Sequence, residues 1–555
     1  MKGLYAEPPG VDFSRQVVQG LRRHLAGQPP DAMARVRLLT NTNRMARRIE
    51  MAFLETGASL LPKIGLVSDI PALLPPTLPL PDAISPLALR LTLTRLTRAL
   101  LQTSDLAPPE AAFDLAGSLA NLMEEMQEEA VPADALTQID AGDLATYWQQ
   151  SLQFLRIAGD WRPETTASRQ ATALNHLLAL WAQTPPTDPV IIAGSTGSRG
   201  ATRALIAAVL QLPKGAVILP GLDRDMPDNA WDDLTPDKAQ GAHDHPQYRL
   251  AALLKTHNLT RADVPRWGDD QPANPARNAL LSLALRPAPT TDAWLDEGPR
   301  LQDIDRATAQ ITLLDAPSPT DEAAAIAIGL RAALDQGKRA ALITPDRTLS
   351  RQVAAHLDRW GILPDDSAGI PLVQSAPGRL LMHLAHLRTR PVEAEGLMIL
   401  LKHPLTHATA DRTAHLRRTR ALEIDLLRKA PLAFPTPDAI RAWSDDPNDP
   451  WTTWLADTLT QLSTQPGTAP LADHIAAHLA LADQTVGDAL WDGPAGRTAF
   501  HVLQNLALTA PEADTTPITA TDYARILHTL LSAEEVRDTY APHPDIMIWG
   551  ALEAR

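Results

Sequence analysis

The sequence predicts an α/β protein in which two parallel-sheet domains are each interrupted by a block of helices. Short apolar runs alternate with helical patterns at three places, residues 4–54, 189–219 and 311–378. Strands that alternate with helices of this length form parallel sheets covered by helices on both faces. Two longer stretches, Leu87–Gln183 and Leu380–Ala533, follow helical spacing without a convincing strand, and they predict the helical blocks.

Length and composition indicate a globular chain of several domains. Its 555 residues are too many for one core, and 45% are hydrophobic against 21% charged. Its net charge of −15 argues against a protein that coats DNA over its whole surface, although a local basic channel is compatible with it. The lack of cysteine excludes disulfides and thiolate metal sites within this chain. Because neither a membrane-length apolar run nor a signal peptide is evident, we expect a cytoplasmic protein with no membrane partner.

The first half of the chain predicts a sheet domain with a helical insertion. The expected strands are Leu4–Ala6, Val36–Thr40, Pro189–Ala193 and Ala216–Leu219. The helices that follow the first three strands are Arg15–Leu25, Arg44–Leu54 and Thr202–Gln211. The proline-rich stretch Pro71–Pro86 precedes the insertion, in which residues 144–163 form one expected helix. After the last strand we expect the acidic irregular stretch Asp225–Asp244, a helix at Pro246–His257, and a Pro/Asp-rich linker at Asp263–Asp305 with a short helix at Asn278–Ala284.

The second half contains the most regular alternation of strand and helix. The expected elements are strand Ile311–Leu314, helix Asp321–Leu334, strand Ala340–Thr344, helix Leu349–Trp360 and a final strand Asp545–Trp549. Two acids in the first turn of the first helix complement its dipole, and Asp346 is the predicted N-cap of the second. Because the sequence ends shortly after the expected strand Asp545–Trp549, we expect the second sheet domain to be incomplete and the sequence to be a fragment.

Two loops occupy positions where a parallel-sheet protein can hold a phosphate. A phosphate loop needs the pattern G-x-x-x-x-G-K-[ST], with glycines for close backbone approach and a lysine for the phosphates. The loop within Leu4–Leu25 has only Gly10, no lysine, and two prolines that remove amide donors. The loop Gly194–Thr202 is richer in glycine but lacks the lysine and has the wrong spacing. A simple turn is favoured there, and an anion bound to its amides is the alternative.

The acidic and histidine clusters are weak candidates for metal sites. Four carboxylates share a helix face, where a solvated surface is favoured over a di-iron site because no Glu-x-x-His partner follows: Glu124, Glu125, Glu128 and Glu129. The short cluster His243–His245 lies in an acidic loop, and the nearby aspartates lack regular ligand spacing: Asp223, Asp225, Asp232 and Asp233. We therefore predict no catalytic, cofactor-binding or metal-binding residue.

The densest basic segment lies on an expected helix and is a candidate for phosphate contacts. Its members are Arg412, Arg417, Arg418, Arg420, Arg428 and Lys429. From this group we select Arg417 and Arg418 as candidate DNA contacts. A surface helix whose arginines pair with neighbouring acids is an equally good interpretation.

The order of these parts resembles the 1A-1B-2A-2B plan of the UvrD-like (superfamily 1) helicases. Within that group the chain resembles the AddB family, in its alphaproteobacterial form, whose members are subunits of the AddAB helicase–nuclease. The stretches that carry the resemblance are LYAEPPGVDFSRQVVQGL, LLTNTNRMARRIEMAF, VIIAGSTGSRGATRAL, AVILPGLDRDMPDNAW, HPQYRLAALL, DRTLSRQVAAHLDRWGILPDDSAGIPL and IMIWGALEAR. The resemblance implies two RecA-like domains, each with a helical insertion. The implied division is 1–85 and 186–262 (domain 1A), 86–185 (insertion 1B), 263–305 (linker), 306–379 and 541–555 (domain 2A), and 380–540 (insertion 2B).

The helicase motifs fail when they are carried over to this sequence. The Walker A position falls on Pro8–Ser14, which has no Gly-Lys-Thr, and the Walker B acid is replaced by Ala193 and Gly194. The expected nucleotide-contacting arginine falls near Pro345, with Arg347 displaced by two residues. We therefore expect no ATP hydrolysis by this chain. The alternative is an active nucleotide-dependent enzyme that uses residues 194–202 as an unusual phosphate loop.

The resemblance also implies binding partners and a cellular process. It implies a non-motor subunit in recombinational repair of double-strand breaks, which binds single- and double-stranded DNA and forms a heterodimer with an AddA-like motor subunit. The turn at Asn41 and Asn43, with Arg44, resembles a motif that touches single-stranded DNA in working helicases, and these residues are candidate DNA contacts. A nuclease domain and its iron–sulfur cluster are expected only outside this sequence. We expect no cofactor in this chain.

Overall fold

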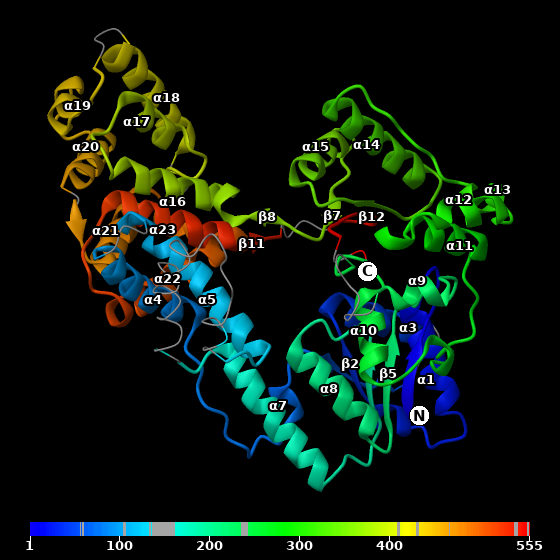
Figure 1. The fold of residues 1–555 in the computed structure, drawn as a ribbon. Coiled ribbons are helices and arrows are strands. Elements are labelled where there is room, and N and C mark those ends of the chain that lie inside the picture. The colour runs from blue at the N-terminus through cyan, green and yellow to red at the C-terminus, as the bar shows by residue number, and fades with distance from the viewer. Residues whose placement is uncertain are drawn as a thin grey trace. The chain divides into compact units, whose positions relative to one another are not determined.

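The computed structural model divides the chain into two compact units (Figure 1). The structure describes residues 1–555 except 56, 58–59, 104–106, 133–134, 136–160, 162, 235–241, 408–410, 429–431, 465–466, 538–541, 552–553 and 555. The first unit holds Met1–Ile84 and the described parts of Asn121–Asp143 and Ala158–Leu313. The second holds the described parts of Ser85–Ala120 and Leu314–Arg555.

The first unit is built on a five-stranded sheet in which all neighbouring strands are parallel. The strand order is β1-β5-β4-β2-β3. The strands are β1 (Gly3–Ala6), β2 (Arg37–Thr40), β3 (Lys63–Leu66), β4 (Val190–Ala193) and β5 (Gly215–Leu219). The predicted parallel sheet is confirmed. Edge strand β3 was not predicted, because it has few apolar side chains and none of its residues is fully buried.

Successive residues of the central strands point to opposite faces of this sheet, and each face has its own core. Leu38 on β2 packs with α1 (Phe13–His24) and α3 (Asn43–Glu55). The next residue, Leu39, packs with α7 (Thr166–Gln183), α8 (Gly200–Gln211) and α10 (Tyr248–Thr256). Helices therefore cover both faces, as Figure 1 shows. The other helices of this unit are α2 (Ala32–Arg35), α9 (Asp228–Asp232), α11 (Pro275–Ala284), α12 (Ala293–Glu297) and α13 (Ile304–Thr308).

The start of the stretch predicted as a linker is part of the first unit's core. Trp267 is fully buried, its indole Nε1 donates to the carbonyl of Val17 at 3.2 Å, and its ring stacks on His24. The ring lies so close to Gly20 that a Cβ there would be 2.1 Å from Nε1. Only glycine at this point of α1 lets the tryptophan approach the helix.

The second unit contains a smaller parallel sheet of order β6-β12-β7. Its strands are β6 (Ala340–Ile343), β7 (Pro364–Asp366) and β12 (His543–Trp549), and its helices are α14 (Pro319–Asp335) and α15 (Arg347–Asp358). The strand predicted at Ile311–Leu314 is wrong. Those residues have no strand conformation, and Leu313 is 93% exposed. An apolar run forms a strand only where a neighbouring strand pairs with it, and among the described residues none pairs here.

The rest of the second unit is a block of helices, as predicted. Its helices are α16 (Ala376–Leu387), α17 (Ala394–Lys402), α18 (Arg412–Leu422), a π-helix (Glu423–Arg428), α19 (Pro437–Trp443), α20 (Pro450–Ser463), α21 (Leu471–Thr485), α22 (Gly493–Ala513) and α23 (Ala520–Ala533). Two short antiparallel pairs join β8 (Ile370–Pro371) to β11 (Glu535–Val536) and β9 (Thr468–Ala469) to β10 (Ile518–Thr519).

The helices predicted as the first insertion divide between the two units. Helix α4 (Pro86–Leu101) packs on α22, where Arg98 forms an ion pair with the buried carboxylate of Asp514 at 2.9 Å. Helix α5 (Ala112–Glu128) belongs to the second unit up to Ala120 and to the first unit from Asn121. The helix predicted at 144–163 lies outside the described residues except at its last residues.

Candidate nucleic-acid interface

The carboxyl ends of the parallel strands lie at one edge of the first sheet, and three helices begin there. Strand β1 leads into α1, β2 into α3, and β4 into α8. In open parallel sheets, ligands bind at this edge, where helix N-termini offer free amide donors to anions. What occupies each of the three N-termini therefore decides whether a phosphate can be held there.

A carboxylate of the chain itself closes the N-terminus of α1. One oxygen of Asp12 accepts a hydrogen bond from the Arg15 amide at 3.1 Å, and the other pairs with the Arg48 guanidinium at 2.7 Å. Partial burial raises the pKa of Asp12, but these donors outweigh it, and the net pKa is lowered. Asp12 is thus held as an anion at the point where a phosphate would otherwise sit.

The loop before α1 is also covered by the segment around Trp267. The buried carboxylate of Glu7 accepts hydrogen bonds from the amides of Trp267, at 2.9 Å, and Gly268, at 2.6 Å. Further along, the Asn278 side chain donates to the Pro9 carbonyl at 2.8 Å, and the Ala273 amide donates to the Gly10 carbonyl at 3.3 Å. Residues 265–278 therefore lie over the loop that would have to wrap a nucleotide phosphate.

A second carboxylate closes the N-terminus of α8. One oxygen of Glu129 accepts from the Gly200 amide at 2.8 Å, and the other pairs with Arg203 at 2.7 Å. Partial burial raises the pKa of Glu129, but the bonds from Arg203 and Gly200 outweigh it and lower the pKa overall. The neighbouring Glu128 pairs with Arg199 at 3.1 Å. The prediction of a solvated acidic face is thus wrong for Glu128 and Glu129, which bind Arg199 and Gly200 of the glycine-rich loop.

These contacts bear directly on the alternative that an anion rests on residues 194–202. The Gly200 amide is occupied by Glu129, and Gly197 donates to the Ser195 hydroxyl at 3.4 Å. An incoming phosphate would have to displace a carboxylate that is held by an arginine. The local sequence contains no signal for this contact, because Glu129 lies 71 residues before Gly200 and 74 before Arg203.

The N-terminus of α3 differs from the other two because a neutral side chain caps it. The Thr42 hydroxyl accepts from the Met45 amide at 3.1 Å, and the flanking Asn41 and Asn43 are exposed. Arg44 is half-buried and engaged in contacts of its own. The side chain of Met45 packs against Gly194, where a Cβ would lie 2.4 Å from its sulfur. The structure thus brings the Asn41–Arg44 turn beside the loop after β4.

The two basic candidates of the second unit have different surroundings, although they are adjacent in sequence. Arg417 is exposed on α18. Arg418 forms an ion pair with Asp449, donates to the Thr452 hydroxyl at 3.3 Å, and lies over the ring of Trp443 at 5.2 Å. Arg418 therefore contributes to the packing of α18 on α19 and α20, whereas Arg417 presents its charge to solvent.

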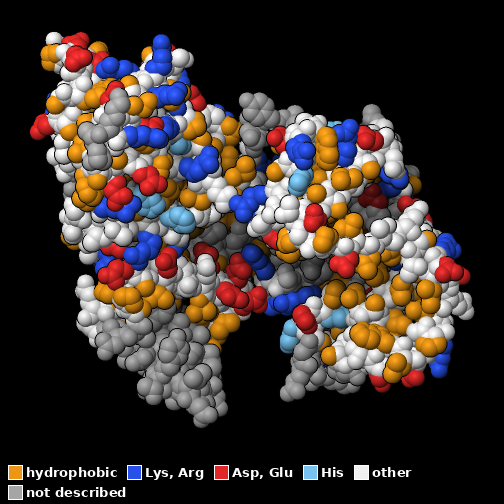
Figure 2. Space-filling view, turned by 90° about the horizontal axis from the view of Figure 1, so that it is seen from above, with side chains coloured by type: hydrophobic (Ala, Val, Ile, Leu, Met, Phe, Trp, Pro, Cys, Tyr) orange, Lys and Arg blue, Asp and Glu red, His pale blue; other side chains and the backbone are white. Residues whose placement is uncertain are grey.

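Two other members of the basic segment, Arg412 and Arg428, are paired with protein groups. Arg412 donates to backbone carbonyls of Lys402 and His403 at the end of α17, and Arg428 forms an ion pair with Glu423. Arg420 is exposed, and Lys429 lies outside the described residues. The interpretation of this segment as a helix paired with acids therefore applies to part of it. On the face in Figure 2, coloured Lys and Arg side chains alternate with Asp and Glu and do not merge into one basic area.

The remaining predicted clusters are engaged in local structure. His245 accepts from the Gln247 amide at 3.1 Å with one ring nitrogen and contacts the Leu285 carbonyl at 2.6 Å with the other. Asp223 accepts from two amides of its own turn. Within the described part of the chain, no group of three or more acidic or histidine side chains could hold a metal ion.

In the second sheet, the Asp346 carboxylate caps α15 as predicted, and Arg347 pairs with Glu535 at 3.3 Å.

Comparison with known proteins adds no assignment. No model of a known protein family matches the chain, and no curated protein matches it either. Among the described helices, none is long and apolar enough to cross a membrane. The arrangement at the sheet edge therefore provides the main argument about function.

Proposed function

We propose that this chain is a non-motor, helicase-like subunit that binds DNA and a motor subunit in the recombinational repair of double-strand breaks. The observation that carries the proposal is the occupation of the sheet edge. Two of the three helix N-termini there hold carboxylates of the chain itself, Asp12 and Glu129, while the third has the neutral cap Thr42. This supports a RecA-like layout that does not handle nucleotide. We propose in addition that the chain needs no cofactor and works in the cytoplasm.

DNA contact at the α3 turn follows from the same geometry. A helix N-terminus without a bound carboxylate is compatible with a nearby DNA phosphate, and exposed asparagine side chains donate hydrogen bonds to phosphate and base oxygens. Asn41 and Asn43 are exposed on either side of Thr42, with Arg44 next to them. The positive charge of Arg417 on the second unit is a further candidate for a backbone phosphate.

DNA binding is tested with the purified chain and the double variant Asn41→Ala/Asn43→Ala. We expect fluorescence anisotropy with single-stranded and forked DNA to show affinity that falls with salt, and roughly tenfold weaker binding for the variant, since each lost hydrogen bond costs about 0.5–1.5 kcal/mol. Asn121→Ala, at an exposed asparagine of α5, is the control and should bind normally. No DNA binding at low salt would reject the proposal in favour of a purely structural protein.

The motor partner is tested separately. We expect the chain to co-purify with an AddA-like motor subunit as a heterodimer, with ATP turnover confined to the motor. The alternative of an active nucleotide-dependent enzyme with a phosphate loop at 194–202 requires an open α8 N-terminus, and Glu129 at 2.8 Å from the Gly200 amide disfavours it.

A further inference from the structure

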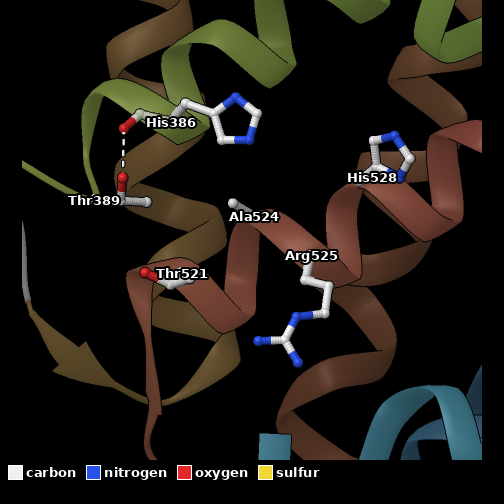
Figure 3. Close-up of a pocket in the computed structure, with 6 residues that line it drawn as sticks. All are labelled: His386, Thr389, Thr521, Ala524, Arg525 and His528. Carbon is white, nitrogen blue, oxygen red and sulfur yellow. Dashed lines mark hydrogen bonds between the residues drawn. The ribbon is translucent and has the colours of Figure 1, made fainter. Parts of the chain in front are cut away.

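The helical block of the second unit contains a pocket with an unusual lining. It has a volume of about 300 Å³ and lies between the end of α16 and the first turns of α23 (Figure 3). His386 and Thr389 come from the end of α16 and the residues after it. The other four lining residues share one face of α23 at helical spacing, and they are Thr521, Ala524, Arg525 and His528.

The polar groups in this lining are neutral or positive, and none is a carboxylate. Arg525 is held in place by its bonds to the Glu110 carbonyl, at 2.7 Å, and to Asp522, at 3.3 Å, which use two of the five N–H groups of a guanidinium. Figure 3 shows His386 on one element and His528 on the other, with Ala524 on the same helix as His528. The lining therefore offers a guanidinium, two imidazoles and the Thr521 hydroxyl as hydrogen-bond donors, whereas the Thr389 hydroxyl already donates to the His386 carbonyl at 2.8 Å.

Two further arginines, Arg388 and Arg390, lie next to lining residues in the sequence. Partial burial, the charge of His528 and the charge of Arg390 all lower the pKa of His386. The side chain of Arg388, which precedes Thr389, is buried, and it donates to the His474 carbonyl at 3.1 Å and lies over the Tyr523 ring. Cationic groups are thus gathered in one place on a chain whose net charge is −15.

We propose that this pocket binds a phosphate group. Its donors match the oxygens of an anion, and charge-assisted bonds from arginine and histidine are the strong ones in such sites. Two imidazoles without a third ligand do not make a metal site, and the described residues contain no cluster of three ligands. A volume near 300 Å³ is at the lower end for ligand pockets and fits a phosphate with a small substituent. The phosphate is either part of a nucleic-acid backbone or of a small phosphorylated molecule.

Binding to this pocket should strengthen as the pH falls. Protonation of His386 adds positive charge beside the anion, and the bound phosphate in turn favours the protonated imidazole. The charged groups that face His386 are Arg390 after α16, and Asp522 and Arg525 on α23. Asp522 pairs with Arg525, and the lowered pKa of His386 keeps its imidazole neutral in the empty pocket, so the proton is taken up together with the anion.

The test uses the full chain and the double variant His386→Gln/His528→Gln, with His501→Gln as a control at an exposed histidine of α22. Calorimetric titrations use inorganic phosphate, a deoxynucleoside monophosphate and a short single-stranded oligodeoxynucleotide, each at pH 6 and pH 8. We expect at least one ligand to bind at least tenfold more tightly at pH 6, and the double variant to lose that gain while the control keeps it.

The pattern among the ligands identifies the source of the phosphate. Oligodeoxynucleotide binding that the double variant weakens, without binding of either small ligand, indicates a backbone phosphate, and binding of either small ligand that the double variant weakens indicates a small phosphorylated molecule. The proposal is overturned if no ligand binds, or if the double variant, folded by its circular dichroism, binds as tightly as the parent. The pocket does not involve the Asn41 turn, so the Asn41→Ala/Asn43→Ala variant should keep the gain in binding at pH 6, which separates this result from the DNA test above.

Discussion

At the scale of single residues, a few buried contacts hold residues 265–278 over the loop before α1. Among the described residues, Trp267 is the largest fully buried side chain, and the Glu7 carboxylate accepts hydrogen bonds from its amide and from that of Gly268. Neither contact could be predicted from the sequence. A tryptophan in a Pro/Asp-rich stretch has no periodic pattern around it, and its partner Gly20 lies 247 residues earlier in the chain.

The substitution Gly20→Ala tests the role of Trp267. The new methyl group would overlap the rigid indole, and overpacking of this kind costs roughly 1–3 kcal/mol, so we expect a clearly lower melting temperature. Gly329→Ala on α14 is the matched control, because a Cβ there meets nothing within 4 Å. Alanine should stabilise that helix by about 0.5–1 kcal/mol. Equal melting temperatures for Gly20→Ala and the parent would show that the indole can move away.

The adjacent arginines of α18 give a second prediction at this scale. Arg417→Ala should weaken DNA binding at low salt and leave the melting temperature unchanged, since the side chain is exposed. Arg418→Ala should instead destabilise the protein by roughly 1–2 kcal/mol, because it removes an ion pair with Asp449 and a contact with Trp443. Anisotropy and thermal melts on both variants separate the two roles. The reverse pattern would contradict this division.

At the scale of elements, the N-termini of helices decide what the sheet edge can bind. The helices themselves were predictable from apolar spacing, and so was the cap Asp346 on α15. The carboxylate at the start of α8 could not be predicted, because Glu129 directly follows α5 and lies more than 70 positions before Gly200. Local sequence patterns report caps supplied by neighbouring residues and are silent on caps supplied from elsewhere in the fold.

Glu129 predicts a specific dependence of stability on pH. Its pKa is lowered from 4.5 in the folded state, so its contribution is present above that value and is lost as the pH falls through the folded pKa. We expect Glu129→Gln to lower stability at pH 7 by roughly 1 kcal/mol, the scale of one hydrogen bond, and the difference to vanish well below pH 4.5. The exposed Glu125→Gln should show no difference at either pH. A deficit for Glu129→Gln that persists in acid would point to lost packing instead.

At the scale of the whole molecule, alternating strand and helix patterns predicted the α/β class and the first sheet but not every strand. Edge strand β3 and the short strand β7 carry too few apolar residues to be recognised. The opposite error occurred at Ile311–Leu314, whose apolar side chains are exposed. Both errors have one cause, because a strand depends on its partners as much as on its own side chains. The proposal of a role in DNA repair rests on the resemblance to helicases, and the sheet edge supplies the reason to expect no ATP turnover.

The most direct measurement is equilibrium binding of ATP with Mg²⁺ to the purified chain. We expect no saturable binding up to millimolar nucleotide, because Asp12, Glu129 and the segment over Gly10 occupy the places where its phosphates would sit. Saturable micromolar binding that is lost on substitution within residues 194–202 would contradict this expectation, and it would identify the glycine-rich loop as a working phosphate site.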